Sequence, residues 1–572
     1  MACQKRTTVP KAIVEVLMTE AVEIVFGLAG SHILPILNEL ASTPEIGHVV
    51  VKHENSAAVM AGMYGYLTGR PGVALVTAGP GAAHAVSGVA LAYASSNPMV
   101  LISGGVQVGS TTGAYHGVDR GDFLQEMFSP ITKWTVRVHD PEDAAVSLAD
   151  AFAIASSDRP GPVMVEFPWD ILQGELVASR RLGSPTVHRQ QPDEASVDAT
   201  LGELAKSQHP ILCAGRGVLV HHAEAELLSL VERLSAPVFW TTHADGVMPE
   251  GHPLAVGSFD PWTENPLAWE LMRESDFMLV AGMRSGSLES TLLAERSPSS
   301  TVFVSLDEPG AFSPVDFALV SGAADVRLFL SRVLEQLPAQ QRSADPSVLR
   351  RIDRRRRALS IGRNELLARH SEAQPMHFGP VLQEIASQVE QGAIVVAGVG
   401  NHSAWARTIF AAHSRDSFLA TGPWGTMGAE VPGGICAKLI HPDRQVIVVT
   451  GDGSLLMALS DLATAAETKA NVLIAVLNDS RYGMITAMQT VEFGRTFGDR
   501  LGPVDFAKQA QAVGLEGVRV ERPRDLSQAV RRSLELTRES PVVLDAVCDS
   551  AFGWPDRETL IQEGLERLNS SG

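Results

Sequence analysis

The sequence has few cysteines, no long hydrophobic run and no signal-peptide core. Its four cysteines are far apart and form no CxxC pair, which excludes a disulfide scaffold and a structural zinc site and fits reduced thiols. No apolar run approaches the roughly 18 residues needed to span a bilayer, and the N-terminus carries no apolar segment of the signal-peptide kind. We therefore expect a soluble, cytoplasmic protein.

Basic residues are outnumbered by acidic ones. The chain has 46 lysines and arginines against 65 aspartates and glutamates, which gives a formal charge of −19. This balance argues against nucleic acid or an anionic membrane as the main partner. One basic run, residues 350–357, has the spacing of a helix face and is interpreted as a solvated linker helix.

The chain is too long for a single core. Along its 572 residues, three stretches alternate short apolar runs with amphipathic helices, as parallel α/β domains do. We expect three consecutive parallel-sheet α/β domains over residues 1–185, 190–340 and 375–555. A charged linker over 341–374 and a C-terminal tail over 556–572 complete the expected organisation.

Two polar turns each follow an apolar strand in the third of these domains. One strand ends in Gly451-Asp452-Gly453-Ser454, and the next ends in Asn478-Asp479-Ser480. In a right-handed parallel crossover the two strands lie side by side or nearly so, which puts both turns where open α/β sheets bind ligands. A carboxylate from Asp452, an amide oxygen from Asn478 and a main-chain carbonyl near Ser480 are hard oxygen ligands that suit Mg²⁺.

The same turn is suited to phosphate groups. Gly451 and Gly453 let the backbone approach a phosphate, and the N-terminus of the helix that begins by Ser454 favours negative charge. A Gly-Asp-Gly turn followed at this distance by an asparagine resembles the signature of the thiamine-diphosphate-dependent enzymes. The segments KHENSAA, LTGRPGVALVTAGPGAAHAV and TGPWGTMGAEVPGGICAKLI resemble the same family in the same order.

Within that family the resemblance is to the branch of acetohydroxyacid synthase and pyruvate oxidase, which includes benzaldehyde lyase. It implies a thiamine pyrimidine-binding domain at 1–185, a central Rossmann-like domain at 190–340 and a thiamine diphosphate-binding domain at 375–555. It also implies that thiamine diphosphate and Mg²⁺ are the cofactors. The expected assembly is a homodimer or homotetramer, because in this family Glu54 of one subunit meets the Asp452 site of another.

Glu54 follows an expected strand and precedes an Ala-rich helix, where an acidic residue would suit the first turn in any case. The resemblance assigns it a catalytic role. Its carboxylate would hydrogen-bond the aminopyrimidine ring, so that the exocyclic nitrogen removes the thiazolium C2 proton and a ylid forms. The resemblance places further residues at the cofactor: Gly79, Pro80, Gly81, Gly398, Asn401, His402, Met427 and Met484, besides Gly451, Gly453 and Ser454.

The substrate pocket is expected to contain His32. This residue, beside Ser31, matches a histidine in the substrate pocket of benzaldehyde lyase. The family's active-site glutamine is out of register here, and His116, Asp119 or Gln125 can stand in for it; His116 is taken as a candidate catalytic residue.

Other positions depart from the synthase pattern. His84 occupies a place usually held by asparagine, and Met488 matches a tryptophan that selects the larger acceptor in the synthases. Both point to an unusual substrate. Whether FAD is bound stays open: residues 215–217 form a lone GxG after a strand, and Arg284 matches one of two arginines of the flavin-binding members.

The function expected from the resemblance is acetolactate-synthase-like: carboligation or decarboxylation of a 2-oxo acid such as pyruvate, by a ylid and an enamine intermediate. Two alternatives stay open, a benzaldehyde-lyase-like acyloin lyase or ligase and a flavin-dependent 2-oxo acid oxidase. A non-catalytic cofactor-binding scaffold is a remote alternative, against which the joint presence of Glu54, Asp452, Asn478 and Met427 argues.

Overall fold

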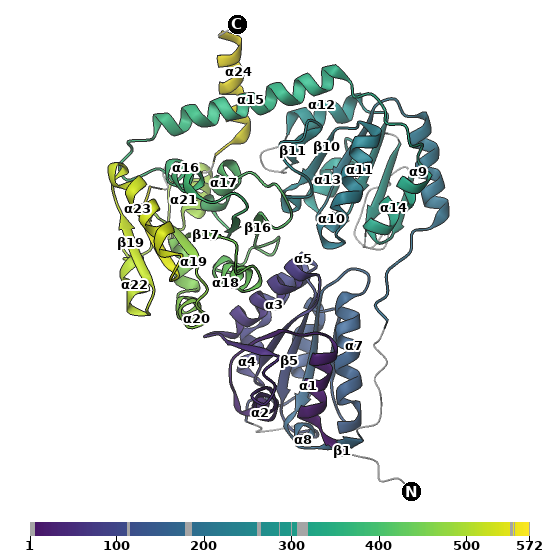
Figure 1. Ribbon diagram of the computed structural model, residues 1–572, viewed down its shortest axis with the longest axis vertical. Helices are drawn as coiled ribbons and strands as arrows, with labels where there is room; N and C mark the ends of the chain where they lie inside the picture. The colour runs from purple at the N-terminus through teal and green to yellow at the C-terminus, as the bar shows by residue number, and fades with distance from the viewer. Residues whose placement is uncertain are drawn as a thin grey trace.

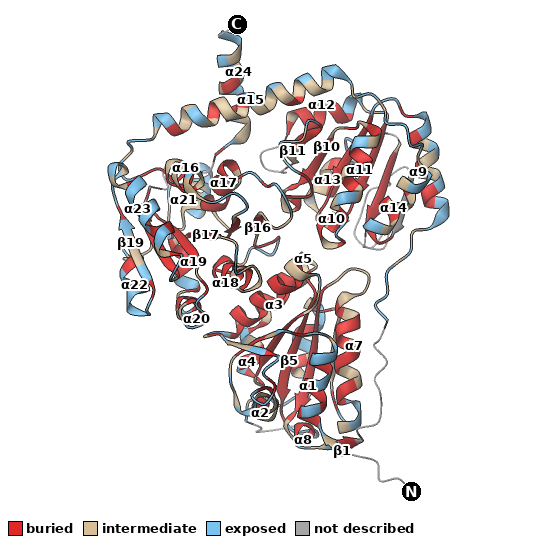
Figure 2. Cartoon of the chain, in the orientation of Figure 1, coloured by how far each residue is buried: buried red, intermediate tan, exposed pale blue. Residues whose placement is uncertain are grey.

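The computed structural model describes residues 6–110, 115–177, 186–259, 265–284, 287–298, 300–305, 319–549, 553 and 555–570. These residues form three six-stranded parallel sheets with helices packed around each, and one small antiparallel pair (Figure 1). The expected α/β class with three consecutive parallel-sheet domains is confirmed. The inner strands of each sheet are almost completely buried, which explains their continuous apolar sequence (Figure 2).

The N-terminal sheet has the strand order β3-β2-β4-β5-β7-β6. Its strands are β2 (Ile24–Gly27), β3 (Gly47–Val50), β4 (Gly72–Val76), β5 (Met99–Gly105), β6 (Trp134–Arg137) and β7 (Pro162–Pro168). The helices are α1 (Val9–Thr19), α2 (Leu34–Leu40), α3 (Glu54–Thr68), α4 (Pro80–His84), α5 (Val86–Ser95), α6 (Phe123–Phe128), α7 (Ala144–Ser156) and α8 (Trp169–Leu172). Strand β1 (Arg6–Thr8) pairs with β8 (Glu175–Val177) at the edge of this domain.

The middle sheet has the order β11-β10-β9-β12-β13-β14, which is the order 3-2-1-4-5-6 of dinucleotide-binding folds. Its strands are β9 (Pro210–Ala214), β10 (Val238–Thr241), β11 (Ala255–Phe259), β12 (Phe277–Ala281), β13 (Thr301–Ser305) and β14 (Leu319–Ala323). The helices are α9 (Glu194–Lys206), α10 (Gly217–Val220), α11 (Glu224–Leu234), α12 (Pro266–Glu274), α13 (Leu288–Ala294) and α14 (Val326–Gln336). This domain is Rossmann-like, as expected.

The C-terminal sheet has the order β16-β15-β17-β18-β20-β19, the same sequence of crossovers as in the N-terminal sheet. Its strands are β15 (Ile394–Ala397), β16 (Phe418–Ala420), β17 (Val446–Gly451), β18 (Leu473–Asn478), β19 (Glu516–Val520) and β20 (Val542–Val547). The helices are α16 (Phe378–Gln388), α17 (Asn401–Ile409), α18 (Glu430–Ile440), α19 (Asp452–Met457), α20 (Asp461–Thr468), α21 (Gly483–Phe493), α22 (Phe506–Ala512) and α23 (Pro523–Leu536).

A long helix, α15 (Pro346–Arg369), crosses from the middle to the C-terminal domain, and α24 (Arg557–Ser570) packs across it (Figure 1). The two helices approach closely because each presents a glycine: a Cβ on Gly362 would overlap Leu560, and one on Gly564 would overlap Ala358. The helix face of Arg350, Arg354 and Arg357 is exposed, in agreement with its interpretation as a solvated face, whereas other arginines of the run form ion pairs with neighbouring helices. Arg355 pairs with Glu558 of α24 at 2.8 Å, and Arg351 pairs with two glutamates of α12.

Helix α3 joins the N-terminal domain to the C-terminal one. Its helical bounds follow from an N-cap at His53, whose Nδ1 accepts from Asn55 N at 3.1 Å, and from Gly69 at φ +70°. It packs on α18, and Ser56 donates a 2.9 Å hydrogen bond to Asp461 of α20.

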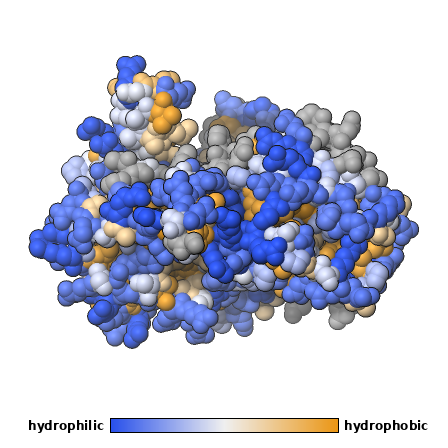
Figure 3. Space-filling model, turned by 90° about the horizontal axis from the view of Figure 1, so that it is seen from above, coloured by the Kyte–Doolittle hydropathy of each residue, from blue (hydrophilic) through white to orange (hydrophobic). Residues whose placement is uncertain are grey.

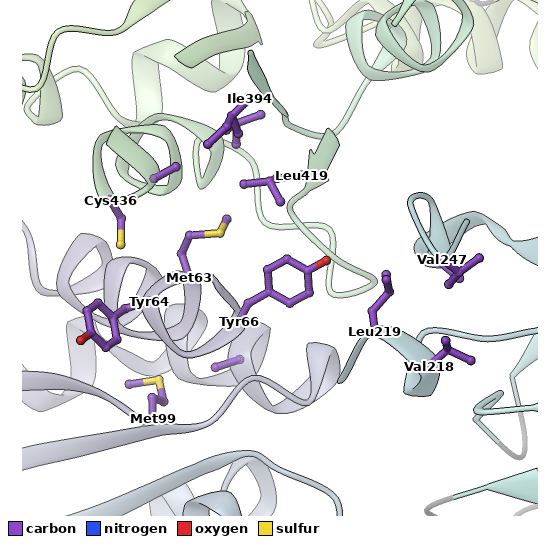
Figure 4. Packing of buried hydrophobic residues seen from close by; sticks show 14 of the residues in the cluster. Met63, Tyr64, Tyr66, Met99, Val218, Leu219, Val247, Ile394, Leu419 and Cys436 are labelled. Atoms are coloured by element: carbon purple, nitrogen blue, oxygen red, sulfur yellow. The ribbon is translucent and has the colours of Figure 1, made fainter. Parts of the chain in front are cut away.

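One hydrophobic cluster runs through all three domains, as Figure 4 shows for Tyr66, Leu219 and Leu419. On the outside, the face seen from above is mostly hydrophilic with scattered apolar areas (Figure 3). No helix among the described residues is long and apolar enough to cross a membrane.

Candidate active site

The two polar turns of the C-terminal domain lie next to each other. Strands β17 and β18 pair in parallel with Gly451 opposite Leu477, so Asp452 and Asn478 follow at neighbouring positions of the same sheet edge. The predicted side-by-side arrangement of the two strands is confirmed. Ser454 lies in the first turn of α19 and is buried, as is Asp452 itself.

The Asp452 carboxylate is buried in a place that is costly for an unpaired charge. Its Oδ1 accepts from Gly453 N at 2.8 Å, whereas Oδ2 is buried with no hydrogen-bond partner among the described residues. Burial, and to a smaller extent the Asp479 carboxylate, raise the pKa of Asp452 to about 7, although backbone N–H groups oppose the rise. A cation at Oδ2 would relieve this cost.

Asn478 presents its oxygen in the way that a metal ligand requires. Its amide nitrogen donates to Val504 O at 3.0 Å and to Asp545 Oδ1 at 2.9 Å, so both N–H groups are engaged and the amide oxygen stays available. Ser480 has φ +55°, and its carbonyl accepts from Leu501 N at 2.9 Å with one lone pair, which leaves the other. These oxygens fit a hard cation such as Mg²⁺.

Glycines and unpartnered polar side chains surround these turns. A Cβ on Gly398 would overlap the Glu430 carboxylate, one on Gly453 would lie 2.7 Å from Tyr482, and one on Gly451 would lie 3.0 Å from Nδ1 of His402. These three glycines are therefore required by the close packing around the two turns. We call the polar group formed by residues 398–402, 451–454 and 478–480 the cradle.

Helix α17 begins at this cradle with Asn401 and His402, both buried. The two polar atoms of the Asn401 side chain and Nε2 of His402 have no hydrogen-bond partner among the described residues. Burial lowers the pKa of His402 to about 4, so its imidazole is neutral at physiological pH. Such buried, unsatisfied groups at a helix N-terminus are what a polar ligand would pair with.

The two predicted methionines border the same edge. Met427 lies half-buried in the segment between β16 and α18, and Met484 lies half-buried in the first turn of α21. On α21, Met488 is 50% exposed and Val491 is 89% exposed. The helix thus carries an uncovered apolar surface close to the predicted cofactor residues.

Glu54 lies in the N-terminal domain, as the first residue of α3, and is 7% exposed. Its Oε2 is 3.0 Å from Nδ1 of His84, and its Oε1 is 3.3 Å from the place of a Cβ on Gly81. Pro80 begins helix α4, and Gly79 at φ +60° lies against the His116 carbonyl. The structure therefore brings Glu54 together with residues 79–81.

His32 and His116 lie in one aromatic group at the edge of this domain. Their ring centroids are 5.0 Å apart, and Tyr115 stacks on His116 at 4.0 Å. Burial lowers the pKa of His32, with a further contribution from His116. His116 has φ +65°, a conformation that costs free energy in a residue other than glycine. Asp119, another candidate for the displaced glutamine, is exposed.

Glu166 was missed by the sequence analysis. It is fully buried in β7, where Arg137 and Gln125 hold it, the latter at 2.5 Å from Nε2 to Oε2. Burial raises its pKa to about 7, against the effects of Arg137 and Gln125. The signal was a lone glutamate inside an otherwise apolar strand. Because Gln125 is engaged by Glu166, His116 is the candidate that stands beside His32.

Glu430 is a second buried carboxylate that the sequence analysis missed. Thr450 donates to its Oε1 at 2.5 Å, and its Oε2 has no hydrogen-bond partner among the described residues. Burial raises its pKa to about 7, while nearby hydrogen bonds oppose the rise. It lies directly under Gly398, at the floor of the cradle.

A cavity of about 580 Å³ lies at the carboxyl ends of the middle sheet, on the side of β9, β10 and β12. Arg284 lies on its exposed rim, and Arg216 is held by Ser95 O and Asn97 Oδ1. Gly215 and Gly217 are explained by packing, because a Cβ on either would overlap the turn at residues 282–283.

Comparison with known proteins gives one consistent family. Three profiles match, described as thiamine pyrophosphate enzyme N-terminal TPP binding domain (residues 7–135), central domain (197–333) and C-terminal TPP binding domain (398–546). The acetolactate synthase large subunit of Corynebacterium glutamicum is 30% identical, over 97% of this chain and 89% of its own length. The large subunit of acetolactate synthase isozyme 3 of Escherichia coli is 29% identical, over 94% of each chain. A probable large subunit from Methanocaldococcus jannaschii is 30% identical, over 95% and 92%.

Proposed function

Because the chain belongs to the thiamine pyrophosphate enzyme family, we propose that it is an acetolactate-synthase-like carboligase acting on a 2-oxo acid such as pyruvate. The observation that carries the proposal is the buried Asp452 carboxylate, whose Oδ2 has no hydrogen-bond partner among the described residues, beside the available oxygen of Asn478. The full-length similarity to acetolactate synthases supports the reaction class.

In this proposal Asp452, Asn478 and the carbonyl of Ser480 would hold Mg²⁺, which would offset the negative charge of a bound diphosphate. Gly451, Gly453 and Ser454 offer the start of α19 to the phosphates. Gly398, Asn401, His402, Met427 and Met484 line the same cradle. Thiamine diphosphate supplies, when bound, a nucleophilic carbon and an electron sink.

Glu54 holds a proton at the aminopyrimidine ring, which prepares the cofactor's amino group to act as a base. His32 and His116 then face the substrate carbonyl. Burial keeps the imidazole of His32 neutral at physiological pH, so that it can donate a hydrogen bond without carrying charge. The Glu54 carboxylate and the cradle belong to different domains. We propose that they meet between two copies of the chain, in a homodimer or homotetramer.

Product analysis by NMR tests the proposal. Purified protein with thiamine diphosphate and Mg²⁺ would receive ¹³C-labelled pyruvate and be followed for CO₂ and labelled products. Acetolactate or acetoin supports the carboligase. Untouched pyruvate, with bound cofactor demonstrated by calorimetry, contradicts the carboligase proposal. It favours the second candidate function, cleavage or formation of acyloins, which is supported by the contact between His32 and Ser31.

FAD stays a prediction for the cavity of the middle domain, which lies where open doubly wound sheets bind nucleotides. The flavin absorption band of the purified protein checks it. Retention of the band by wild type and its loss in Arg284→Glu would place the flavin in this cavity. A colourless protein that takes up no added FAD would contradict the prediction, and the oxidase alternative with it.

A further inference from the structure

The carboxylate of Glu54 has a hydrogen-bond partner on helix α4, and this partner is a histidine. His84, the last residue of α4, lies with its Nδ1 at 3.0 Å from Oε2. It stands one turn after Gly81, which lies beside the other oxygen, Oε1. One short helix therefore touches both oxygens of the carboxylate, and at its end stands a histidine in place of the usual asparagine.

This geometry gives the two oxygens different tasks. With its Nδ1 protonated, the neutral imidazole donates to Oε2 and fixes the rotation of the carboxylate. Oε1 has the glycine Gly81 beside it, where a Cβ would lie only 3.3 Å from this oxygen, so the lack of a side chain there leaves room at Oε1. Oε1 is thus the oxygen that can reach the ring nitrogen of the aminopyrimidine.

A histidine at this place differs from an asparagine in one respect, because it can gain a charge. A protonated imidazole favours the ionised carboxylate and so weakens the sharing of a proton between Glu54 and the cofactor. The side chain of His84 is 54% exposed, so protons from solvent reach it. A charge on this imidazole would therefore change how strongly Glu54 holds a proton for the cofactor.

Other charged and aromatic side chains lie around the pair of His84 and Glu54. The His53 ring stacks on His84 with centroids 4.8 Å apart and caps α3 through its Nδ1. Lys52 pairs with Glu467 of α20, and Asp461 accepts from Ser56. The atoms of His53, Glu54 and His84 are near enough for a metal ion, yet the two rings are stacked at 25°. A shared cation would need their nitrogens to converge, so hydrogen bonding explains the group better.

We propose that His84 is a positioning residue for Glu54: its neutral imidazole turns the carboxylate toward the cofactor, and its protonation slows cofactor activation. The proposal rests on the proposed role of Glu54. It adds a pH control that an asparagine at this place could not give.

The test measures hydrogen–deuterium exchange at the cofactor C2 in the holoenzyme, by quenched flow and NMR, as a function of pH. In wild type we expect the rate to rise by roughly tenfold between about pH 5 and 8 through one ionisation. His84→Asn keeps a donor and loses the proton, so this step should disappear from its profile. His53→Asn keeps the helix cap, and its profile should match that of wild type.

Glu54→Gln distinguishes the proposed role of His84 from the proposed role of Glu54, on which it rests. Slow exchange in Glu54→Gln, with the wild-type profile retained in His84→Asn, would overturn the role of His84 alone. Wild-type exchange in Glu54→Gln would overturn the role of Glu54 itself. Calorimetry of thiamine diphosphate and Mg²⁺ binding shows for each variant that the cofactor is in place.

Discussion

At the scale of single residues, Asp452 tests the metal site most directly. Asp452→Ala removes the carboxylate whose Oδ2 has no hydrogen-bond partner in the described part of the chain. We expect Mg²⁺-dependent binding of thiamine diphosphate to weaken by more than the roughly 10–100-fold that losing an outer-shell partner costs. Calorimetry with and without Mg²⁺ measures it, and Asp525→Ala on the exposed start of α23 is the control. Unchanged affinity in Asp452→Ala would contradict the metal assignment.

Glu430 makes a prediction about stability and pH. Its pKa in the folded protein is about 7, above the ordinary value of 4.5, so the folded state holds a proton that the unfolded state releases. Stability from this proton is complete below the unfolded pKa and is lost as pH rises through the folded one. The loss is on the order of 3 kcal/mol, and Glu430→Gln cannot incur it.

The melting temperature measures this effect. Between about pH 5 and 8 it should fall less in Glu430→Gln than in wild type, because one buried carboxyl no longer ionises. Glu492→Gln, at an exposed position of α21, should follow wild type. Parallel curves for Glu430→Gln and wild type would show that Glu430 does not titrate in this range.

Sequence spacing predicts the neighbourhood of Asp452 and Asn478, because parallel strands end at one edge of a sheet. It does not predict that Glu166 and Glu430 are buried. Glu166 is held by Arg137 and Gln125, and Glu430 by Thr450, all from other elements. A buried carboxylate in a lone sequence looks like a surface one until the partners that satisfy it are placed in space.

At the scale of elements, the crossing of α15 and α24 depends on two glycines. In Gly564→Ala the new Cβ would overlap the main chain at Ala358. We expect the helices to separate slightly at a cost of about 1–3 kcal/mol, with faster proteolysis of α24. Gly202→Ala in α9, where nothing lies within 4 Å, is the matched control and should be neutral or stabilising. Equal proteolysis of both variants would contradict the close approach.

The arginine run of α15 shows what periodicity leaves out. The spacing of residues 350–357 predicts a helix, and these residues do lie within helix α15. The spacing does not say which helices lie next to α15. The ion pairs of Arg351 with α12 and of Arg355 with α24 could therefore not be predicted from it. Periodicity describes one helix, whereas ion pairs between helices depend on the tertiary fold.

At the scale of the whole molecule, the proposed meeting of Glu54 and Asp452 between copies can be tested by mixing inactive subunits. Glu54→Gln and Asp452→Ala homo-oligomers should each be inactive. Mixed dimers would contain one site with both changes and one with neither, so about a quarter of wild-type activity should return after random exchange. Glu54→Gln mixed with Glu54→Gln,Asp452→Ala is the control and should stay inactive.

Failure of the first mixture to recover activity, with subunit exchange shown by mass spectrometry, would place both groups in one copy. The sequence predicts three domains and their class but contains no direct information on this point. The assembly depends on which surfaces fit each other, and exposed apolar residues such as Met488 and Val491 on α21 offer apolar surface for it.

The hydrophobic cluster that passes through Tyr66, Leu219 and Leu419 has a thermodynamic consequence. Domains joined by a flexible linker melt independently, whereas domains that share buried apolar surface lose it together. No one of the three sheets can unfold without exposing side chains that the other two help to bury. We therefore expect calorimetry to record one cooperative unfolding transition, and heat that opens one α/β domain to inactivate the whole enzyme.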